Sequence, residues 1–305
     1  MVVSIDNEAL AKEVINPSPP KLLQELLANS VIKQKVDTFL NEMTQKRICN
    51  HSLFVCQGEY SGVSFSKADK IAWIGTSGAT TCHIVVIHDN DSVALAHIDS
   101  PNSVDNTIEN MISGMGHELS LYVVGGFSEE KMTSYSISSC LLEYFHQSEK
   151  HLNIQLWCTL DLNTKISDEL SYPILTDVAF RLEDRSLHNV IFEYRGPELE
   201  LRSLLRQDSV QDFNIFDKET CLIKIPYVEF EMDPRYRGAA SAPDNFLLSR
   251  CSTSPYCEPD YFCQDMRNFF LFIATKDSNM VFGPNKEPMI YEMNNDGVWV
   301  RQDNI

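Results

Sequence analysis

The chain has 305 residues, of which 43% are hydrophobic and 22% are charged, as in an ordinary globular protein. It is long enough to bury a sizeable core, so neither metal ions nor disulfides are needed to hold the fold. The net charge of −18 argues against a nucleic acid or an anionic membrane surface as the main partner. It suits a cationic ligand, or it serves solubility alone.

The cysteines and the first residues indicate where the protein works. Nine cysteines are scattered from Cys49 to Cys263 without a dense, even framework, so we expect free thiols in a reducing compartment. The N-terminus carries acids and lacks the apolar run of a signal peptide. No window approaches the ~18 apolar residues of a membrane span. The sequence therefore predicts a cytoplasmic protein, with the nucleus as a second location.

The first half of the chain predicts two helices followed by a sheet. Ser18 precedes prolines and a leucine stripe at helical spacing, so a helix is expected to begin there, and a second one over 31–43. Apolar, β-branched runs then predict strands over 52–56, 70–74, 84–87, 92–98 and 119–124. Gly125 and Gly126 close the last of these, which indicates a bend or a backbone close to another group.

The second half alternates between the two element types. Helices are expected over 128–147, 198–206 and 259–273, and strands over 154–160, 173–180, 189–194 and 222–230, the last with Pro226 at an edge or bulge. Asn295-Asp296-Gly297 predicts a hairpin before 298–300, and 235–242 is the most loop-like stretch. We predict an α+β fold with a mixed sheet and flanking helices. Residues 1–65 would pack on a catalytic domain over 66–305, as one structural unit.

One cysteine differs from the others in its setting. Cys82 lies where a loop of small residues enters an apolar strand, and His97 ends the next apolar run. On neighbouring strands, the two side chains could meet, and a base beside a thiol makes it a nucleophile. His83 follows the cysteine directly, so on a strand it would point to the opposite face. A structural cysteine and a buried core histidine are the alternative interpretation.

Motifs for other chemistries are missing from the sequence. There is no Cys-x-x-Cys pair with zinc-ligand spacing and no P-loop. Gly114-Met115-Gly116 lacks the rest of a dinucleotide-binding fingerprint. We therefore expect neither a metal nor an organic cofactor.

Four short blocks together resemble a known family. They are Thr80-Thr81-Cys82-His83-Ile84-Val85-Val86, Val123-Val124-Gly125-Gly126-Phe127-Ser128, Arg195-Gly196-Pro197-Glu198 and Ser252-Thr253-Ser254-Pro255. In this order they resemble the protein N-terminal asparagine amidohydrolases. The resemblance spans about 70–260, and the first two blocks are the more specific.

The resemblance implies hydrolysis of the side-chain amide of an N-terminal asparagine in proteins, giving aspartate and ammonia. The new aspartate would be arginylated, so N-degron machinery is an implied partner. A distant similarity to chemoreceptor glutamine deamidases and deamidating toxins implies a layered α-β-β sandwich. It also implies Cys82 as nucleophile, His97 as base and Thr76 as the residue that orients the imidazole, with Ser77 as the alternative hydroxyl.

The reaction makes further demands on the site. Backbone N–H groups near Thr81 and Cys82 are natural donors to a developing oxyanion. An N-terminal asparagine also presents an α-ammonium group, which a carboxylate would read. Asp99 is the first candidate, two residues from His97 on the same strand face, with Glu258 and Glu198 as alternatives; each could equally be a solvated surface acid.

Two other functions fit the same residues. A cysteine peptidase would use the same pair but would release a new peptide end instead of ammonia. A non-catalytic reader of N-terminal residues would bind such peptides without converting them, and its function would survive loss of the thiol.

Overall fold

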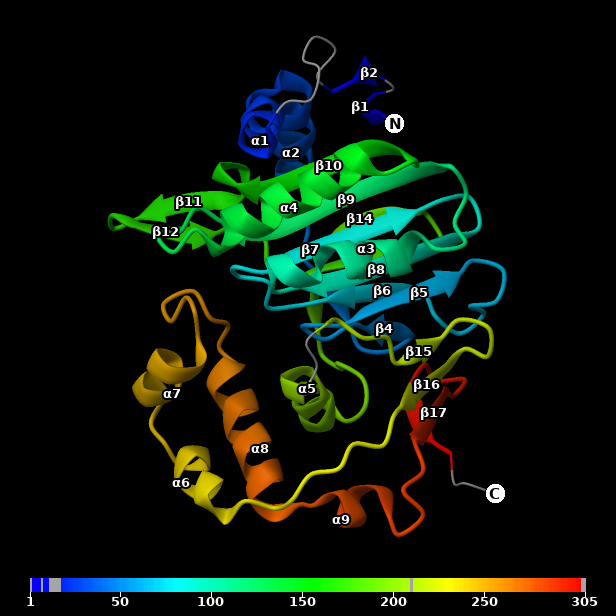
Figure 1. The fold of residues 1–305 in the computed structure, drawn as a ribbon, viewed down its shortest axis with the longest axis vertical. Helices are drawn as coiled ribbons and strands as arrows, with labels where there is room; N and C mark the ends of the chain where they lie inside the picture. Colours follow the sequence, from blue (N-terminus) through cyan, green and yellow to red (C-terminus); the bar gives the residue numbers. More distant parts are fainter. Residues whose placement is uncertain (1, 7, 11–17, 209–210, 303–305) are drawn as a thin grey trace.

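The computed structural model describes residues 2–6, 8–10, 18–208 and 211–302 and contains several mixed sheets flanked by helices (Figure 1). The predicted α+β class is therefore confirmed. Among the described residues, no helix combines the length and the apolar character needed to cross a membrane.

The largest sheet has seven strands and holds the cysteine-bearing region near its middle. Its order is β2-β1-β10-β9-β7-β8-β5, and β7 runs antiparallel to both neighbours. The strands are β1 (Val2–Ile5), β2 (Glu8–Ala9), β5 (Tyr60–Ser64), β7 (His83–His88), β8 (Ser92–Ile98), β9 (Glu118–Phe127) and β10 (His151–Leu160). Apolar residues of β7 point to both faces, so both faces of this strand are buried.

Three helices pack on one face of this sheet. Leu23, Ile108 and Leu141 of these helices share a buried cluster with Val85 and Val123 of the strands. The helices are α1 (Pro19–Ala28), α3 (Val104–Ile112) and α4 (Thr133–Gln147). The neighbouring helix α2 (Ser30–Glu42) begins where the Asn29 side chain accepts from two backbone N–H groups.

A five-stranded sheet contributes to the cluster on the other face. Its order is β3-β14-β13-β6-β4, and its Ile74 and Phe180 share one core with Ile84 and Leu95 of the larger sheet. The strands are β3 (Lys46–Ile48), β4 (Ser52–Phe54), β6 (Trp73–Thr76), β13 (Val178–Arg181) and β14 (Ser186–Phe192). The strands that precede residue 65 therefore belong to both sheets: β1, β2 and β5 to the larger one, and β3 and β4 to the five-stranded one.

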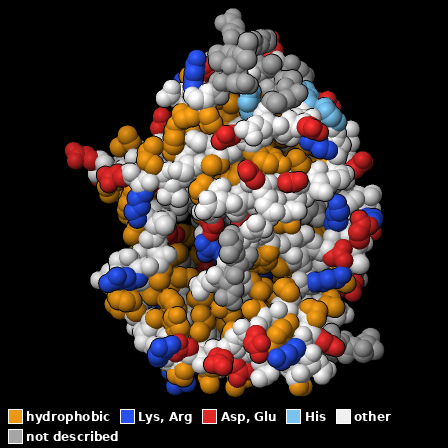
Figure 2. Space-filling view, in the orientation of Figure 1, with side chains coloured by type: hydrophobic (Ala, Val, Ile, Leu, Met, Phe, Trp, Pro, Cys, Tyr) orange, Lys and Arg blue, Asp and Glu red, His pale blue; other side chains and the backbone are white. Residues whose placement is uncertain are grey.

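The C-terminal part adds a small sheet and short helices below these sheets in Figure 1. The small sheet is β15 (Phe216–Asp217), β16 (Leu222–Ile225), β17 (Met289–Met293) and β18 (Trp299–Arg301), and a separate hairpin is β11 (Thr164–Ser167) and β12 (Leu170–Pro173). The helices of this part are α5 (Leu199–Asp208), η3 (Pro234–Tyr236), α6 (Arg237–Ala240), α7 (Asp244–Cys251), α8 (Phe262–Thr275) and α9 (Ser278–Phe282). Two 3-10 turns lie earlier in the chain, η1 (Pro101–Ser103) before α3 and η2 (Asp161–Asn163) after β10. Figure 2 shows a hollow containing acidic and basic side chains near the middle of this face.

Several boundaries differ from the sequence-based expectations. The prediction of a loop over 235–242 was wrong, because Asp233 caps η3 and α6 follows it, with Tyr236 stacked on Phe270. Helix α4 begins at Thr133 rather than 128, after Met132 adopts a left-handed φ of 60°. Strand β16 ends before Pro226, as a proline without an N–H favours.

Candidate active site

The loop that leads to Cys82 is fixed on several sides. Gly78 N–H donates to Asp177 Oδ1 at 2.7 Å, and Ala79 N–H donates to the Thr176 carbonyl at 3.0 Å. Ala79 itself is fully buried. The cysteine therefore enters β7 from a backbone with little freedom to move.

The four sequence blocks converge on this loop. Ser254 Oγ donates to Thr80 Oγ1 at 3.1 Å, and Thr253 Oγ1 lies 3.1 Å from Thr81 Oγ1. Arg195 lies over the ring of Tyr261, whose hydroxyl donates to Ser77 Oγ at 3.1 Å.

Gly125 and Gly126 of β9 pack directly against the Cys82–His83 segment. A Cβ atom on Gly125 would lie 2.6 Å from the Cys82 carbonyl oxygen, and one on Gly126 would lie 2.4 Å from His83 Cε1. Both glycines also have positive φ values, 99° and 59°. The predicted close approach of this backbone to another group is confirmed, and that group is the cysteine segment.

Cys82 and His97 face the same side of the seven-stranded sheet. Ile84 lies opposite His97 in the ladder between β7 and β8, and Cys82 lies two residues before Ile84. Cys82 directly precedes β7 and packs in the same cluster as Ile84, toward the five-stranded sheet, and His97 faces that side because it lies opposite Ile84. Cys82 retains 6% of its surface exposed and His97 retains 2%.

The imidazole of His97 is hydrogen-bonded to Thr76, the hydroxyl that the family resemblance implies. Thr76 Oγ1 of β6 lies 2.7 Å from His97 Nδ1. The other ring nitrogen, Nε2, is buried and has no hydrogen-bond partner among the described residues. Ser77, the alternative hydroxyl, bonds to Tyr261 instead.

Burial keeps the thiol and the imidazole uncharged. It raises the pKa of the Cys82 thiol, and the charges of Asp99, Glu258 and Asp212 raise it further against the opposing Arg206. Burial also lowers the pKa of His97 to about 4. At neutral pH the site therefore holds a thiol and a neutral imidazole on one face of the sheet, and a neutral imidazole has a ring nitrogen that can accept a proton.

The three candidate acids differ in their surroundings. The Asp99 carboxylate pairs with the Arg206 guanidinium, whose Nε lies 2.6 Å from Oδ2. Glu258 accepts a hydrogen bond from Ser252 and forms no ion pair among the described residues. Glu198 accepts from the Tyr291 hydroxyl at 2.6 Å, and no described contact joins it to Cys82.

Sequence reasoning missed two side chains of this site. Gln57 Nε2 lies 3.6 Å from Cys82 Sγ and 3.1 Å from Asp99 Oδ2. Asp212 accepts from Thr107 Oγ1 at 2.8 Å, and burial raises its pKa to about 6. Both residues lie in irregular connections whose composition carries no signal for contact with a thiol.

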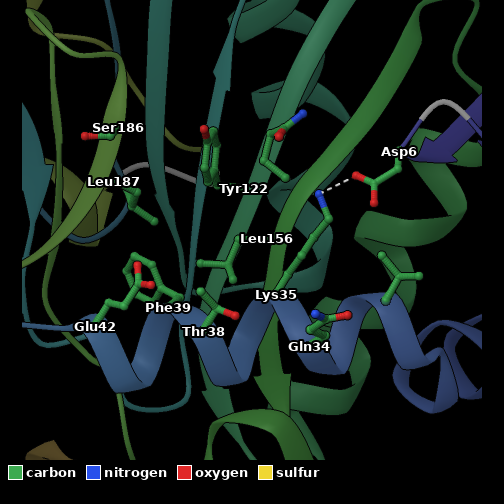
Figure 3. A pocket seen from close by; sticks show the side chains of 12 residues that line it. Asp6, Gln34, Lys35, Thr38, Phe39, Glu42, Tyr122, Leu156, Ser186 and Leu187 are labelled. Atoms are coloured by element: carbon green, nitrogen blue, oxygen red, sulfur yellow. Dashed lines mark ion pairs between the residues drawn. The ribbon is translucent and has the colours of Figure 1, made fainter.

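The cavity in Figure 3 lies away from this pair. It measures about 470 Å³ and is lined by residues of α2, β9, β10 and β14, including Phe39, Tyr122 and Leu156. Lys35 and Asp6 form an ion pair of 2.7 Å at its edge. None of its lining residues is a candidate for the chemistry at Cys82.

Comparisons with known proteins identify relatives of this chain. A family profile described as protein N-terminal asparagine amidohydrolase matches residues 42–301. The chain is similar to the proteins of that name from Homo sapiens and Mus musculus, each 28% identical over 81% of this chain and 83% of the relative. The protein of that name from Arabidopsis thaliana is 24% identical over 91% of this chain and 92% of its own length. The chain belongs to the protein N-terminal asparagine amidohydrolase family.

Proposed function

We propose that the protein hydrolyses the side-chain amide of asparagine at the N-terminus of proteins, releasing ammonia and leaving aspartate. The observation that carries this proposal is the shared face of Cys82 and His97, with Nδ1 of the imidazole bonded to Thr76 and Nε2 unpartnered. The names of the family and of its curated members support the choice of substrate.

The first half of the reaction forms a thioester. As the asparagine side chain approaches, His97 Nε2 takes the proton of Cys82 and the sulfur attacks the amide carbon. When the carbon–nitrogen bond breaks, His97 returns the proton to the leaving nitrogen, and ammonia departs. Thr76 holds the ring at the angle that both transfers need, as the third member of such triads does.

Water completes the cycle. His97 takes a proton from a water molecule that attacks the thioester carbon, and the carbon–sulfur bond breaks. The proton then passes to Cys82 Sγ. The products are aspartate and the regenerated thiol–imidazole pair, and the cycle requires no redox step.

Among the three candidate acids, Glu258 is best suited to bind the substrate α-ammonium. The charge of Glu258 raises the pKa of the Cys82 thiol, so this carboxylate lies close enough to the thiol to influence it. No described cation forms an ion pair with Glu258, whose carboxylate accepts a hydrogen bond from Ser252. Asp99 is already balanced by Arg206, and Glu198 is bonded to Tyr291. A fixed distance from this carboxylate to the thiol would exclude glutamine, whose amide lies one methylene further out.

We further infer the setting of this activity. The helices on one face of the seven-stranded sheet and the five-stranded sheet on the other support a layered α-β-β arrangement of the deamidase type. The aspartate product would be a substrate for arginyl transfer and would feed an N-degron route of degradation. We therefore propose the cytoplasm as the location of the protein, with the nucleus as a second one.

Mass spectrometry of an Asn-initiated peptide tests the proposal. Incubation should convert the amide to the acid and release one ammonia per peptide, while a Gln-initiated control remains unchanged. The Cys82→Ala variant should release none while keeping its fold. A new peptide end would instead indicate a peptidase, and stoichiometric binding without conversion would indicate a reader of N-termini.

A further inference from the structure

The side-chain amide of Gln57 lies between the thiol and an acid. Gln57 Nε2 is 3.6 Å from Cys82 Sγ and 3.1 Å from Asp99 Oδ2. An amide nitrogen carries two N–H groups, so one can serve each neighbour. Gln57 is therefore a side-chain donor aimed at the atom that reacts, and the chemistry described above does not use it.

The connection that carries Gln57 is locked to the strand that carries His97. Gly58 N–H donates to the His97 carbonyl at 2.9 Å, and His97 N–H donates to the Glu59 carbonyl at 3.0 Å. The backbone that follows Gln57 is thus hydrogen-bonded on both sides of the His97 peptide, which fixes where the Gln57 side chain starts relative to β8. A donor that starts from a fixed backbone has less freedom to lose when the reaction proceeds.

A buried ion pair anchors the same connection from beneath. Glu59 and Arg202 are both essentially unexposed, and Arg202 Nε donates to Glu59 Oε1 at 2.9 Å. Glu59 Oε2 in turn accepts from the Cys56 backbone N–H at 2.9 Å. Removing either charge would leave the other buried and alone, so this pair is costly to break.

The neighbours of the amide determine which of its atoms faces the sulfur. A carboxylate paired with a guanidinium offers only acceptor oxygens to its other neighbours, and Asp99 is paired in this way with Arg206. The nitrogen of Gln57, rather than its oxygen, must therefore lie toward Asp99 and the thiol. Gly58 makes room for this arrangement, because a Cβ there would lie 2.9 Å from Arg206 Cγ.

We propose that Gln57 Nε2 donates a hydrogen bond to the carbonyl oxygen of the asparagine side chain as that oxygen becomes an oxyanion. In the tetrahedral intermediate this oxygen is attached to the carbon that Cys82 Sγ has bonded. A donor 3.6 Å from the sulfur can therefore approach the oxygen within the roughly 2.7–3.1 Å of an effective oxyanion donor. No proton is transferred, and Gln57 only stabilises the electron pair displaced from the carbonyl bond.

The carboxylates around the site favour such a donor. Asp99, Glu258 and Asp212 act on Cys82 against the opposing charge of Arg206, and these three carboxylates disfavour negative charge on the sulfur and on a nearby oxygen alike. A neutral amide offsets this field at one point without cancelling the attraction for a cationic chain end. This inference rests on the proposed function, since it names a group that acts in that reaction.

Substitution of Gln57 tests the inference. Gln57→Met removes the donor but keeps a side chain of similar length, and it should lower kcat by about 10²–10³-fold with KM changed little. Gln57→Ala should behave alike, which guards against a packing defect in either variant. Gln34→Ala, on the exposed surface of α2, is the matched control and should retain full activity. Circular dichroism and thermal melting check each fold.

A second measurement separates stabilisation of the oxyanion from general damage. The inhibitor is a peptide whose first residue carries an aldehyde in its side chain. Cys82 Sγ would add reversibly to the aldehyde carbon, and the aldehyde oxygen would then lie where the oxyanion forms. Its inhibition constant should rise in Gln57→Met by the factor lost from kcat, while the affinity for the Asp-initiated product stays the same. Equal losses of affinity for both ligands would overturn the inference.

The two proposals fail in distinguishable ways. If the unaltered protein releases no ammonia from an Asn-initiated peptide, the proposed function is wrong. If it does release ammonia and Gln57→Met turns over at the same rate, only the role of Gln57 is wrong. A rise in KM with unchanged kcat would likewise contradict that role, because it would indicate binding of the ground state.

Discussion

His83 and His97 lie in adjacent strands of one sheet and have similar local environments. Each is buried, with one ring nitrogen bonded to a hydroxyl: His83 Nε2 to Ser138 Oγ at 2.6 Å, and His97 Nδ1 to Thr76 Oγ1 at 2.7 Å. In each ring the other nitrogen is unpartnered among the described residues. Burial lowers the pKa of both, to about 3 and about 4.

The two histidines differ in what shares their face of the sheet. His83 points toward the helices, where Ser138 of α4 and the Gly126 backbone enclose it. His97 points toward the five-stranded sheet, where Cys82 and the charge of Asp99 act. Burial, a hydroxyl partner and a lowered pKa therefore do not make a catalytic base. In the proposed mechanism the distinguishing feature is strand alternation, which puts His97 on the face that Cys82 shares and His83 on the other.

The largest expected effect separates the two histidines. His97→Ala should lower kcat for an Asn-initiated peptide by about 10²–10⁴-fold, because both proton transfers lose their base. His83→Ala should lower the free energy of unfolding by about 1–3 kcal/mol and leave kcat within a few-fold, because it removes a buried hydrogen bond away from the thiol. Steady-state kinetics and urea unfolding measure both effects. If His83→Ala folds well and loses more kcat than His97→Ala, then His83 rather than His97 acts as the base.

The acids of the His97 face provide the next test. Glu258→Gln should raise KM for Asn-initiated peptides by about 10–100-fold, the value of a hydrogen bond between charged groups, with a smaller change in kcat. Glu198→Gln is the matched substitution away from the thiol and should change KM less. If KM rises in Glu198→Gln and not in Glu258→Gln, then Glu198 rather than Glu258 binds the α-ammonium group.

Acid should destabilise the protein through both histidines. Their folded pKa values lie below the ordinary value of 6.5, so the unfolded chain binds more protons as the pH falls through the window from about 6.5 to 4. Each histidine then removes about 1.4 kcal/mol of stability per pH unit, and Asp212, with its raised pKa, opposes this in part. Urea unfolding between pH 7 and 5 should show the loss, with a shallower slope in His83→Gln. Equal slopes would show that His83 is not buried in its neutral form.

The smallest effect concerns the two hydroxyls. Thr76→Val should lower kcat by about 2–10-fold, the value of one neutral hydrogen bond that orients the base. Ser138→Ala removes the corresponding partner of His83 and should affect stability alone. A kcat loss in the Ser138 variant equal to that of Thr76→Val would remove the distinction between the two faces.

The elements with strong periodicity were predictable from the sequence. The apolar runs of β7 and β8 and the polar turn between them placed Cys82 and His97 on paired strands, and alternation placed His83 on the other face. Thr76 followed from the spacing in the resembling family, and its bond to His97 is present in the structure.

Elements that depend on tertiary contacts were missed. Helix α3 has a clear apolar stripe but follows a proline-led turn, so its start was not recognised. Helix α7 and the β11–β12 hairpin are short and gain support from α8 and from β9 that no local pattern reveals. Gln57 belongs to the same class, because it reaches the thiol through a connection fixed by Glu59 and by the backbone of His97.

The hydroxyl contacts of residues 253 and 254 with the loop before Cys82 have a consequence for biosynthesis. Both large sheets are complete by the end of β14, yet the segment that clamps the nucleophile loop lies well downstream. A chain still emerging from the ribosome, or one truncated after β16, could thus assemble most of its strands while its thiol remained poorly held. Competence to turn over substrate would then arise only after this downstream segment had been made.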